Sequence, residues 1–147
     1  MSLYDPRHER DNCGFGLIAH TEGAASHKLI RLAISGLARM QHRGGIAADG
    51  KTGDGCGLLL QKPDSFFRAV AEEKGWNLGR KYAVGMLFLN PDPILAEASR
   101  RIVTEELEKE NLTLVGWRDV PINTKVLGEI ALATLPRIEQ VFVNAPP

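Results

Sequence analysis

Apolar residues recur at the three- and four-residue spacing of an amphipathic helix in three segments of the chain. Each segment follows a residue that caps helices well and stops near a glycine or asparagine that tolerates a left-handed backbone. The sequence therefore predicts three helices: residues 27–43, capped by Ser26 and stopped by Gly44; residues 65–74, capped by Asp64 and ended by Gly75; and a helix from Asp92 and Pro93 to Asn111. The expected apolar faces are Phe66, Phe67, Val70 and Ala71 in the second helix, and Leu95, Ala98, Ile102 and Leu107 in the third.

Runs of apolar and β-branched residues lie between these helices and predict strands. They are residues 13–23, which end in a turn at Glu22 and Gly23, residues 57–62 as a short buried strand, residues 82–90, and two or three strands within residues 112–121 and 128–144. The chain ends soon after the last run, and a strand without a covering layer leads us to expect that the polypeptide is part of something longer. Open sheet edges and uncovered apolar faces would then favour association or marginal stability.

Composition and charge narrow the classes of function. The chain has 147 residues, 44% of them hydrophobic, which is typical of one folded domain. Its 18 basic and 18 acidic residues cancel, so the basic stripe of a nucleic-acid-binding protein is absent and we expect no nucleic-acid partner. The polar first twelve residues and the lack of a long apolar stretch predict a cytoplasmic protein without a membrane partner.

Residues 45–52 match the phosphate-loop pattern G-x-x-x-x-G-K-[ST]. A phosphate loop runs from a strand into the N-terminus of a helix, whereas here a predicted helix comes before the glycines and a predicted strand after them. Asp49 and Asp54 flank Lys51 and would repel an anion. We therefore interpret this segment as a glycine-rich connection, in which Asp49, Lys51, Thr52 and Asp54 shape the loop.

The two cysteines, Cys13 and Cys56, lack the spacing of a metal site, and Cys56 is expected to pack at the start of a strand. Cys13 follows a polar leader in "DNCGFG". Cleavage before Cys13 would leave one residue with a thiol and an α-amine, whose reference pKa values are about 8.5 and about 7.7–8.0. The amine would then serve as the base that activates the thiol. A small buried hydrophobic cysteine is the alternative that the residues leave open.

Four segments, "DNCGFGLIAH", "LARMQHRGG", "ADGKTGDGCGLLLQKP" and "YAVGMLFLN", together resemble the start of the class II glutamine amidotransferase domain of glutamate synthase large subunits. The resemblance implies an α+β fold, the αββα sandwich of N-terminal-nucleophile hydrolases, of which residues 13–147 would be the N-terminal portion. Residues 1–12 would be a leader removed on maturation. Cys13 would be the catalytic nucleophile, and Arg43 and Gly44 would support it in the substrate pocket, with His42 structural.

The resemblance also implies the reaction. L-glutamine would be hydrolysed to glutamate and ammonia, and the ammonia would pass to a flavin domain that converts 2-oxoglutarate to glutamate. FMN and an iron–sulfur cluster are implied for the rest of the large subunit and no cofactor or metal for this chain, because two cysteines do not suffice for a cluster. The implied partners are the rest of that subunit and a small NADPH/FAD subunit.

One part of the family's machinery is missing from the sequence. The family takes its oxyanion donors from an Asn-Gly pair, and this dipeptide does not occur in the chain. We therefore expect little glutaminase activity from these residues alone. Two alternatives remain at this point: a class II amidotransferase with a different ammonia acceptor, and a non-catalytic module in which Cys13 is never exposed.

Overall fold

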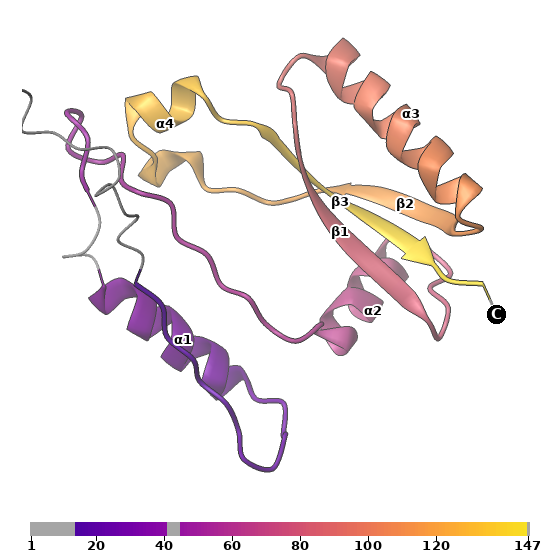
Figure 1. The fold of residues 1–147 in the computed structure, drawn as a ribbon, viewed down its shortest axis with the longest axis horizontal. Helices are drawn as coiled ribbons and strands as arrows, with labels where there is room; N and C mark the ends of the chain where they lie inside the picture. The colour runs from indigo at the N-terminus through magenta and orange to yellow at the C-terminus, as the bar shows by residue number, and fades with distance from the viewer. Residues whose placement is uncertain (1–13, 41–44, 147) are drawn as a thin grey trace, which may run out of the picture. The chain divides into compact units, whose positions relative to one another are not determined.

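The structure is a computed structural model that describes residues 14–40 and 45–146 (Figure 1). The chain divides into two compact units, Met1–Leu59 and Leu60–Pro147, and each is described by itself. Together the described residues form helices and one antiparallel sheet, which confirms a mixed helix-and-sheet protein. None of the described helices is long and apolar enough to cross a membrane.

The first unit contains helix α1, His27–Arg39. The predicted cap is confirmed, because the Ser26 side chain accepts a hydrogen bond from the Lys28 N–H at 3.1 Å. The described helix ends earlier than expected: the N–H of Met40 bonds to the Leu37 carbonyl, and the predicted stop at Gly44 lies outside the described residues.

Two predicted strands of the first half are wrong in the residues that the structure describes. Residues 14–20 and 57–62 form no β-ladder, and Leu59, expected to be buried, is 100% exposed. Both runs have strand-like composition, but a strand also needs a neighbour that pairs with its backbone, which composition alone does not supply. The turn after the first run is confirmed, since Gly23 has φ 67° and its N–H bonds to the His20 carbonyl at 3.0 Å.

The second unit contains most of the regular structure (Figure 1). In chain order its elements are α2 (Asp64–Glu73), β1 (Tyr82–Leu89), α3 (Pro93–Lys109), β2 (Thr113–Asp119), the 3₁₀ turn η3 (Thr124–Val126), α4 (Glu129–Ala133) and β3 (Arg137–Asn144). The sequence located α2, β1, α3 and β2 to within a few residues. Within residues 128–144 it missed α4, a short helix of the helix-favouring residues "EIALA" that follows Gly128.

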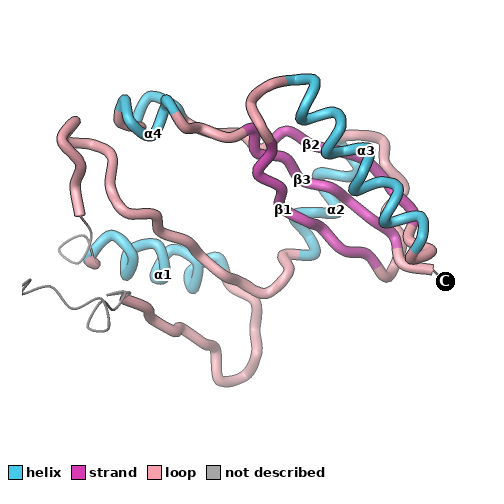
Figure 2. Tube along the Cα trace, turned by 45° about the horizontal axis from the view of Figure 1, so that its top comes forward, coloured by secondary structure: helices cyan, strands magenta, loops and turns pink. Residues whose placement is uncertain are grey.

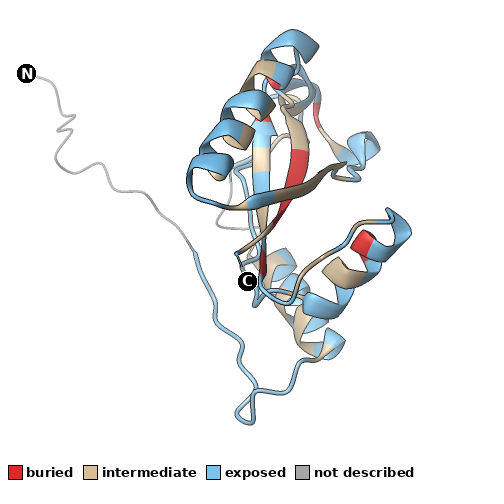
Figure 3. Cartoon of the chain, turned by 90° about the vertical axis from the view of Figure 1, so that its right-hand side faces the viewer, coloured by how far each residue is buried: buried red, intermediate tan, exposed pale blue. Residues whose placement is uncertain are grey.

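The three strands form one sheet in the order β1-β3-β2, with both outer strands antiparallel to β3. The connection from β1 through α3 to β2 therefore leaves room for β3 between them, which is a split βαβ arrangement. β3 is buried along five consecutive residues from Glu139 to Val143, whereas β1 and β2 are only partly covered (Figure 3). The core of this unit thus lies along its central strand.

Helices α2 and α3 cover opposite faces of this sheet (Figure 2). Phe142 of β3, fully buried, points to the α2 side, where its ring lies 5.6 Å from that of Phe67 and 5.3 Å from that of Trp76. Glu139 is three positions away, so it faces the other side of the sheet, where it bonds to Arg100 of α3. The second unit is a helix–sheet–helix layer with β3 in the middle.

The apolar face predicted for α3 is wrong in part. Leu95 and Ile102 are half-exposed or more, whereas Ala96 is completely buried. The face that α3 turns to the sheet contains Ala96 and, four residues later, the partly buried Arg100, which pairs with the buried Glu139. Because a charged residue lies on the covered face, the apolar stripe in the sequence does not mark the face that the helix buries.

The first turn of α2 also differs from the prediction. Asp64 is the first residue of the helix and not its cap, which is Pro63. The Asp64 carboxylate accepts hydrogen bonds from the Tyr82 hydroxyl at 2.7 Å and from Arg68 at 2.9 Å. It therefore joins the helix to the start of β1.

Candidate functional site

The three residues predicted for the site, Cys13, Arg43 and Gly44, lie outside the described residues, as does His42. The structure describes the segments on either side of them: residues 14–20 after Cys13, α1 before residues 41–44, and the loop that begins at Gly45. These segments are the parts of the chain that lead into and out of the predicted site positions.

The segment after Cys13 ends in a turn that His20 organises. The Nδ1 atom of His20 accepts a hydrogen bond from the Glu22 N–H at 3.2 Å, and the His20 carbonyl accepts one from Gly23. These bonds assign His20 a structural role in the turn. Among the described residues, no group of three or more His, Cys, Asp or Glu side chains is arranged to hold a metal ion.

The loop after residue 44 folds back on itself between Gly45 and Asp54. Ile46 and Gly53 form an antiparallel bridge, and the Ala47 N–H bonds to the Thr52 carbonyl at 2.7 Å. Gly50 has φ 69° at the tip, a conformation that glycine adopts without strain. The segment is a tight hairpin-like connection and leads into no helix.

Asp49 occupies the donors that a phosphate loop would offer to an anion. One of its carboxylate oxygens accepts hydrogen bonds from the N–H groups of Lys51 at 3.0 Å and Thr52 at 2.7 Å, and the other accepts one from the Thr52 hydroxyl. The Asp49 carboxylate therefore accepts the backbone N–H groups that would bind the phosphate in a phosphate loop. These contacts support the interpretation of the sequence motif as a connection.

Asp54 holds the beginning of the same loop. Its carboxylate accepts a hydrogen bond from the Gly45 N–H at 2.8 Å, and its own N–H bonds back to the Gly45 carbonyl at 3.3 Å. The predicted loop-shaping role of Asp49 and Asp54 is confirmed, although the sequence did not reveal their partners. Gly45 directly follows Gly44, so Asp54 anchors the chain one residue beyond a predicted site position.

The expectation for Cys56 is wrong. Cys56 is exposed and opens no strand. The reason is the same as for the predicted strand that follows it, which has no pairing neighbour among the described residues. Cys56 is therefore a free surface thiol, and this makes it a useful internal control for the chemistry of Cys13.

The second unit has an ion-pair cluster that sequence patterns did not suggest. Arg100 and Arg137 both bond to the buried carboxylate of Glu139. The hydrogen bond from Arg100 and the charge of Arg100, and then the hydrogen bond and charge of Arg137, hold the pKa of Glu139 below its ordinary value. The bond between Arg100 and Glu139 also raises the pKa of Arg100. Each charge is satisfied by another, which is typical of a structural cluster.

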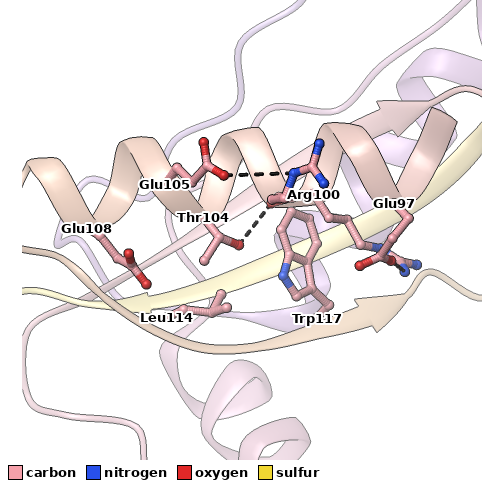
Figure 4. A pocket seen from close by; sticks show the side chains of 8 residues that line it. Glu97, Arg100, Thr104, Glu105, Glu108, Leu114 and Trp117 are labelled. Carbon is pink, nitrogen blue, oxygen red and sulfur yellow. Dashed lines mark hydrogen bonds and ion pairs between the residues drawn. The ribbon is translucent and has the colours of Figure 1, made fainter. Parts of the chain in front are cut away.

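A groove of about 450 Å³ lies beside this cluster, between α3 and β2 (Figure 4). It is lined by Glu97, Arg100, Arg101, Thr104, Glu105, Glu108, Leu114 and Trp117. Arg100 pairs with Glu97 at 2.9 Å, Arg101 lies 3.8 Å from Glu105, and the Thr104 hydroxyl bonds to the Arg100 carbonyl. The described residues contain no buried side-chain polar atom without a partner. The two arginines of the groove are thus paired with glutamates of α3 and β3.

The chain matches the family described as "Glutamine amidotransferases class-II" over residues 13–147. It is 41% identical over 144 residues to the ferredoxin-dependent glutamate synthase 2, chloroplastic, of Arabidopsis thaliana, which covers 97% of this chain and 9% of that protein. It is 39% identical over 147 residues to the glutamate synthase [NADPH] large chain of Bacillus subtilis, covering 99% of this chain and 10% of that protein. The corresponding large chain of Azospirillum brasilense is 41% identical over 145 residues, with 97% and 10% covered.

This chain spans about a tenth of the length of the curated relatives it matches. The family match, by contrast, takes in nearly all of its residues and begins at Cys13, the predicted nucleophile. The protein belongs to the class II glutamine amidotransferase family.

Proposed function

We propose that this chain carries part of the glutamine-hydrolysing site of a glutamate synthase and that Cys13 is the nucleophile. The observation that carries the proposal is the family match, which begins at Cys13 and leaves residues 1–12 outside. This boundary is where a leader would have to be removed for Cys13 to gain a free α-amine. The similarity to glutamate synthases along almost the whole chain supports the choice among amidotransferases.

The chemistry follows from the two groups of an N-terminal cysteine. The α-amine takes the thiol proton, and the thiolate attacks the side-chain amide carbon of glutamine. The carbon–nitrogen bond breaks and ammonia leaves with the proton. Water then hydrolyses the thioester, which releases glutamate and restores the thiol, so one glutamine and one water yield one glutamate and one ammonia.

Arg43 and Gly44 are proposed to support the nucleophile. A guanidinium near a thiol lowers the pKa of the thiol, and a backbone carbonyl can orient the α-amine. α1 leads into this segment, and the bonds of Asp54 to Gly45 fix the chain directly after it. In the sequence, Arg43 and Gly44 thus lie between α1 and Gly45, the residue that Asp54 holds.

The wider proposal follows the family resemblance. The complete domain would be the αββα sandwich of N-terminal-nucleophile hydrolases, in the cytoplasm, and the ammonia would react with 2-oxoglutarate in another part of the enzyme. The family resemblance assigns FMN and an iron–sulfur cluster to the rest of the large subunit, and this chain has only two cysteines, one of them an isolated surface thiol, which are too few to hold a cluster. These groups, and a small NADPH/FAD subunit, would be bound elsewhere in the enzyme.

A chimera tests the nucleophile directly. Residues 1–147 would replace the matching segment of the Bacillus subtilis large chain, with which they share 39% identity. We expect glutamine-dependent glutamate formation, its loss in Cys13→Ala, and its retention in Cys56→Ser, the matched control at an exposed cysteine. Synthesis from added ammonia bypasses glutamine hydrolysis and reports whether the Cys13→Ala protein is folded.

Two results would contradict the proposal. One is glutamine-dependent activity that survives Cys13→Ala, and the other is a mature active chimera whose intact mass still includes residues 1–12. The isolated chain is expected to hydrolyse glutamine poorly, because it lacks the Asn-Gly oxyanion donors and their loss costs about a hundred- to a thousandfold in rate. Fast hydrolysis by the isolated chain would show that the oxyanion donors come from residues within it.

A further inference from the structure

The backbone of Gly45 is held from both sides by one residue, Asp54. The Gly45 N–H donates a hydrogen bond to the Asp54 carboxylate at 2.8 Å, across nine positions of the sequence. The Asp54 N–H bonds back to the Gly45 carbonyl at 3.3 Å. Hydrogen bonds to an ionised group are roughly twice as strong as those between neutral groups. The bond to the carboxylate is therefore the stronger of the two.

The hairpin accounts for one of these bonds but not for the other. Ile46 and Gly53 form an antiparallel bridge, and a backbone bond between the flanking residues, Gly45 and Asp54, belongs to such a ladder. The bond from the Gly45 N–H to the Asp54 side chain is outside this pattern. It depends on the identity of residue 54, whereas the backbone bond does not.

The donor of the side-chain bond belongs to the peptide unit that joins Gly44 to Gly45. A trans peptide unit is planar, and its N–H and C=O groups point in opposite directions. A bond that fixes the direction of the N–H therefore also fixes the direction of the carbonyl in the same unit, which is that of Gly44. Linked hydrogen bonds also polarise one another, so a carboxylate on the N–H makes this carbonyl a stronger acceptor.

Asp49, the other acidic residue of the hairpin, bonds at a different place. Its carboxylate accepts hydrogen bonds from the N–H groups of Lys51 and Thr52, near the tip. The Asp54 side chain bonds at the base of the hairpin, one residue after the predicted site position Gly44. Only the Asp54 bond thus acts on the peptide unit that enters the site.

We propose that Asp54 is a positioning residue for glutamine hydrolysis: through the peptide unit between Gly44 and Gly45 it aims the Gly44 carbonyl, and this carbonyl orients the α-amine of Cys13. The inference rests on the proposed function, in which Cys13 is the nucleophile and a backbone carbonyl orients its amine. Asp54 acts on the base through the backbone and does not bind glutamine.

Loss of the Asp54 carboxylate should slow the reaction without weakening substrate binding. The α-amine has to point at the thiol to take its proton, and a freely turning Gly44 carbonyl no longer holds it there. A displacement of about 1 Å in a catalytic group costs up to about a hundredfold in rate. We therefore expect the effect in kcat and not in the KM for glutamine.

Steady-state kinetics of the chimeric enzyme test the proposal. Every variant is expressed with Cys13 directly after the initiating Met, and intact mass confirms that the mature chain starts at Cys13, so leader removal does not enter the comparison. Asp54→Ala should lower kcat with glutamine by about ten- to a hundredfold and change KM by less than about twofold. Asp54→Asn should recover most of the loss, because its amide oxygen accepts a hydrogen bond from the same N–H.

Asp92→Ala is the matched control. The Asp92 carboxylate caps α3 by accepting a hydrogen bond from the Ile94 N–H at 2.8 Å, the same kind of bond at the same length as the one that Asp54 accepts. Asp92→Ala removes this bond from the second unit and should leave kcat with glutamine unchanged. Synthesis from added ammonia should be unchanged in all variants and reports that they are folded.

Alkylation of Cys13 by iodoacetamide gives a readout that needs no glutamine. In the mature chain the tryptic peptide of residues 13–28 contains Cys13 and no other cysteine, so mass spectrometry follows this thiol alone. The α-amine takes the thiol proton before either reaction. The alkylation rate should therefore fall in Asp54→Ala and recover in Asp54→Asn, whereas a change limited to substrate binding would leave it constant.

Four results would overturn the inference: an unaltered kcat in Asp54→Ala, equal losses in Asp54→Ala and Asp92→Ala, an Asp54→Asn enzyme as slow as Asp54→Ala, or a raised KM with kcat retained. Should Asp54→Ala lose synthesis from ammonia and so prove misfolded, Asp54→Glu takes its place. It keeps the charge but displaces the carboxylate, and it should lose kcat in the same way.

The Cys13→Ala enzyme separates this inference from the proposed function. Glutamine-dependent activity that survives Cys13→Ala contradicts the proposed function and this inference with it. An inactive Cys13→Ala enzyme beside a fully active Asp54→Ala enzyme contradicts the inference about Asp54 alone.

Discussion

Replacing Gly116 by alanine should destabilise the second unit because there is no room for a methyl group. A Cβ atom at this position would lie 2.5 Å from the Cε2 and Cζ2 atoms of Trp76. The indole cannot easily withdraw. Its ring packs 5.3 Å from that of the fully buried Phe142, and the backbone N–H of Trp76 bonds to the Ala71 carbonyl at 2.8 Å, which holds the residue in place.

The size of the effect can be worked from these distances. Carbon atoms in ordinary contact lie about 3.5–4.0 Å apart, so the ring or the strand must shift by roughly 1 Å or more. Overpacking of this kind costs about 1–3 kcal/mol. Removing a glycine from a strand recovers about 0.5–1 kcal/mol. We therefore expect Gly116→Ala to lower the free energy of unfolding by about 1–2 kcal/mol.

Urea unfolding followed by tryptophan fluorescence measures this change, because both tryptophans of the chain lie in the second unit. Gly85→Ala is the matched control. Gly85 in β1 lies opposite Val141 in β3, and its Cβ would lie 3.1 Å from a Val141 methyl group and 3.8 Å from a Leu87 methyl group, both of which can give way. It should stay within about 0.5 kcal/mol of the unaltered protein or stabilise it.

A double-mutant cycle identifies the cause. In a Trp76→Leu background the clashing ring atoms are gone, so Gly116→Ala should lose most of its cost there. Equal stabilities of Gly116→Ala and Gly85→Ala would refute the reasoning, as would an unchanged cost after Trp76→Leu.

Three further predictions rest on single side chains. The pKa of Glu139 is lowered in the fold, so its ionised form stabilises the unit above the ordinary value of 4.5 and this contribution is lost as the pH falls below it. Glu139→Gln should lower the free energy of unfolding at neutral pH by about 3 kcal/mol and flatten its pH dependence in acid, as measured by urea titrations. Burial, and then the hydrogen bond to the Asp64 carboxylate, raise the pKa of Tyr82 from 10.0 to about 12. The free energy of unfolding should therefore fall as the pH rises between these values, and Tyr82→Phe should remove that fall in the same urea titrations. Asp54→Ala should speed exchange of the Gly45 amide, which bonds to the Asp54 carboxylate at 2.8 Å, whereas Asp54→Asn retains an acceptor and should speed it less.

The sequence located the elements whose signals are local. Ser26 and Asp92 cap their helices as expected, and Asn111, with φ 57°, ends α3 where the sequence placed its end. The loop roles of Asp49 and Asp54 were also predictable, because acidic residues among glycines bond readily to nearby backbone N–H groups. The family resemblance was likewise contained in short sequence motifs, which the match over residues 13–147 confirmed.

Tertiary structure decided what depends on distant partners. Strand-like composition at residues 57–62 produced no strand, whereas residues 137–144 became the buried centre of the sheet because β1 and β2 flank them. The covered face of α3 includes Arg100, whose partner Glu139 lies thirty-nine residues away, and no local pattern encodes this ion pair. Caps and turns are set by interactions within a few residues, but pairing, burial and edge exposure are properties of which segments meet, and that is known only once the chain has folded.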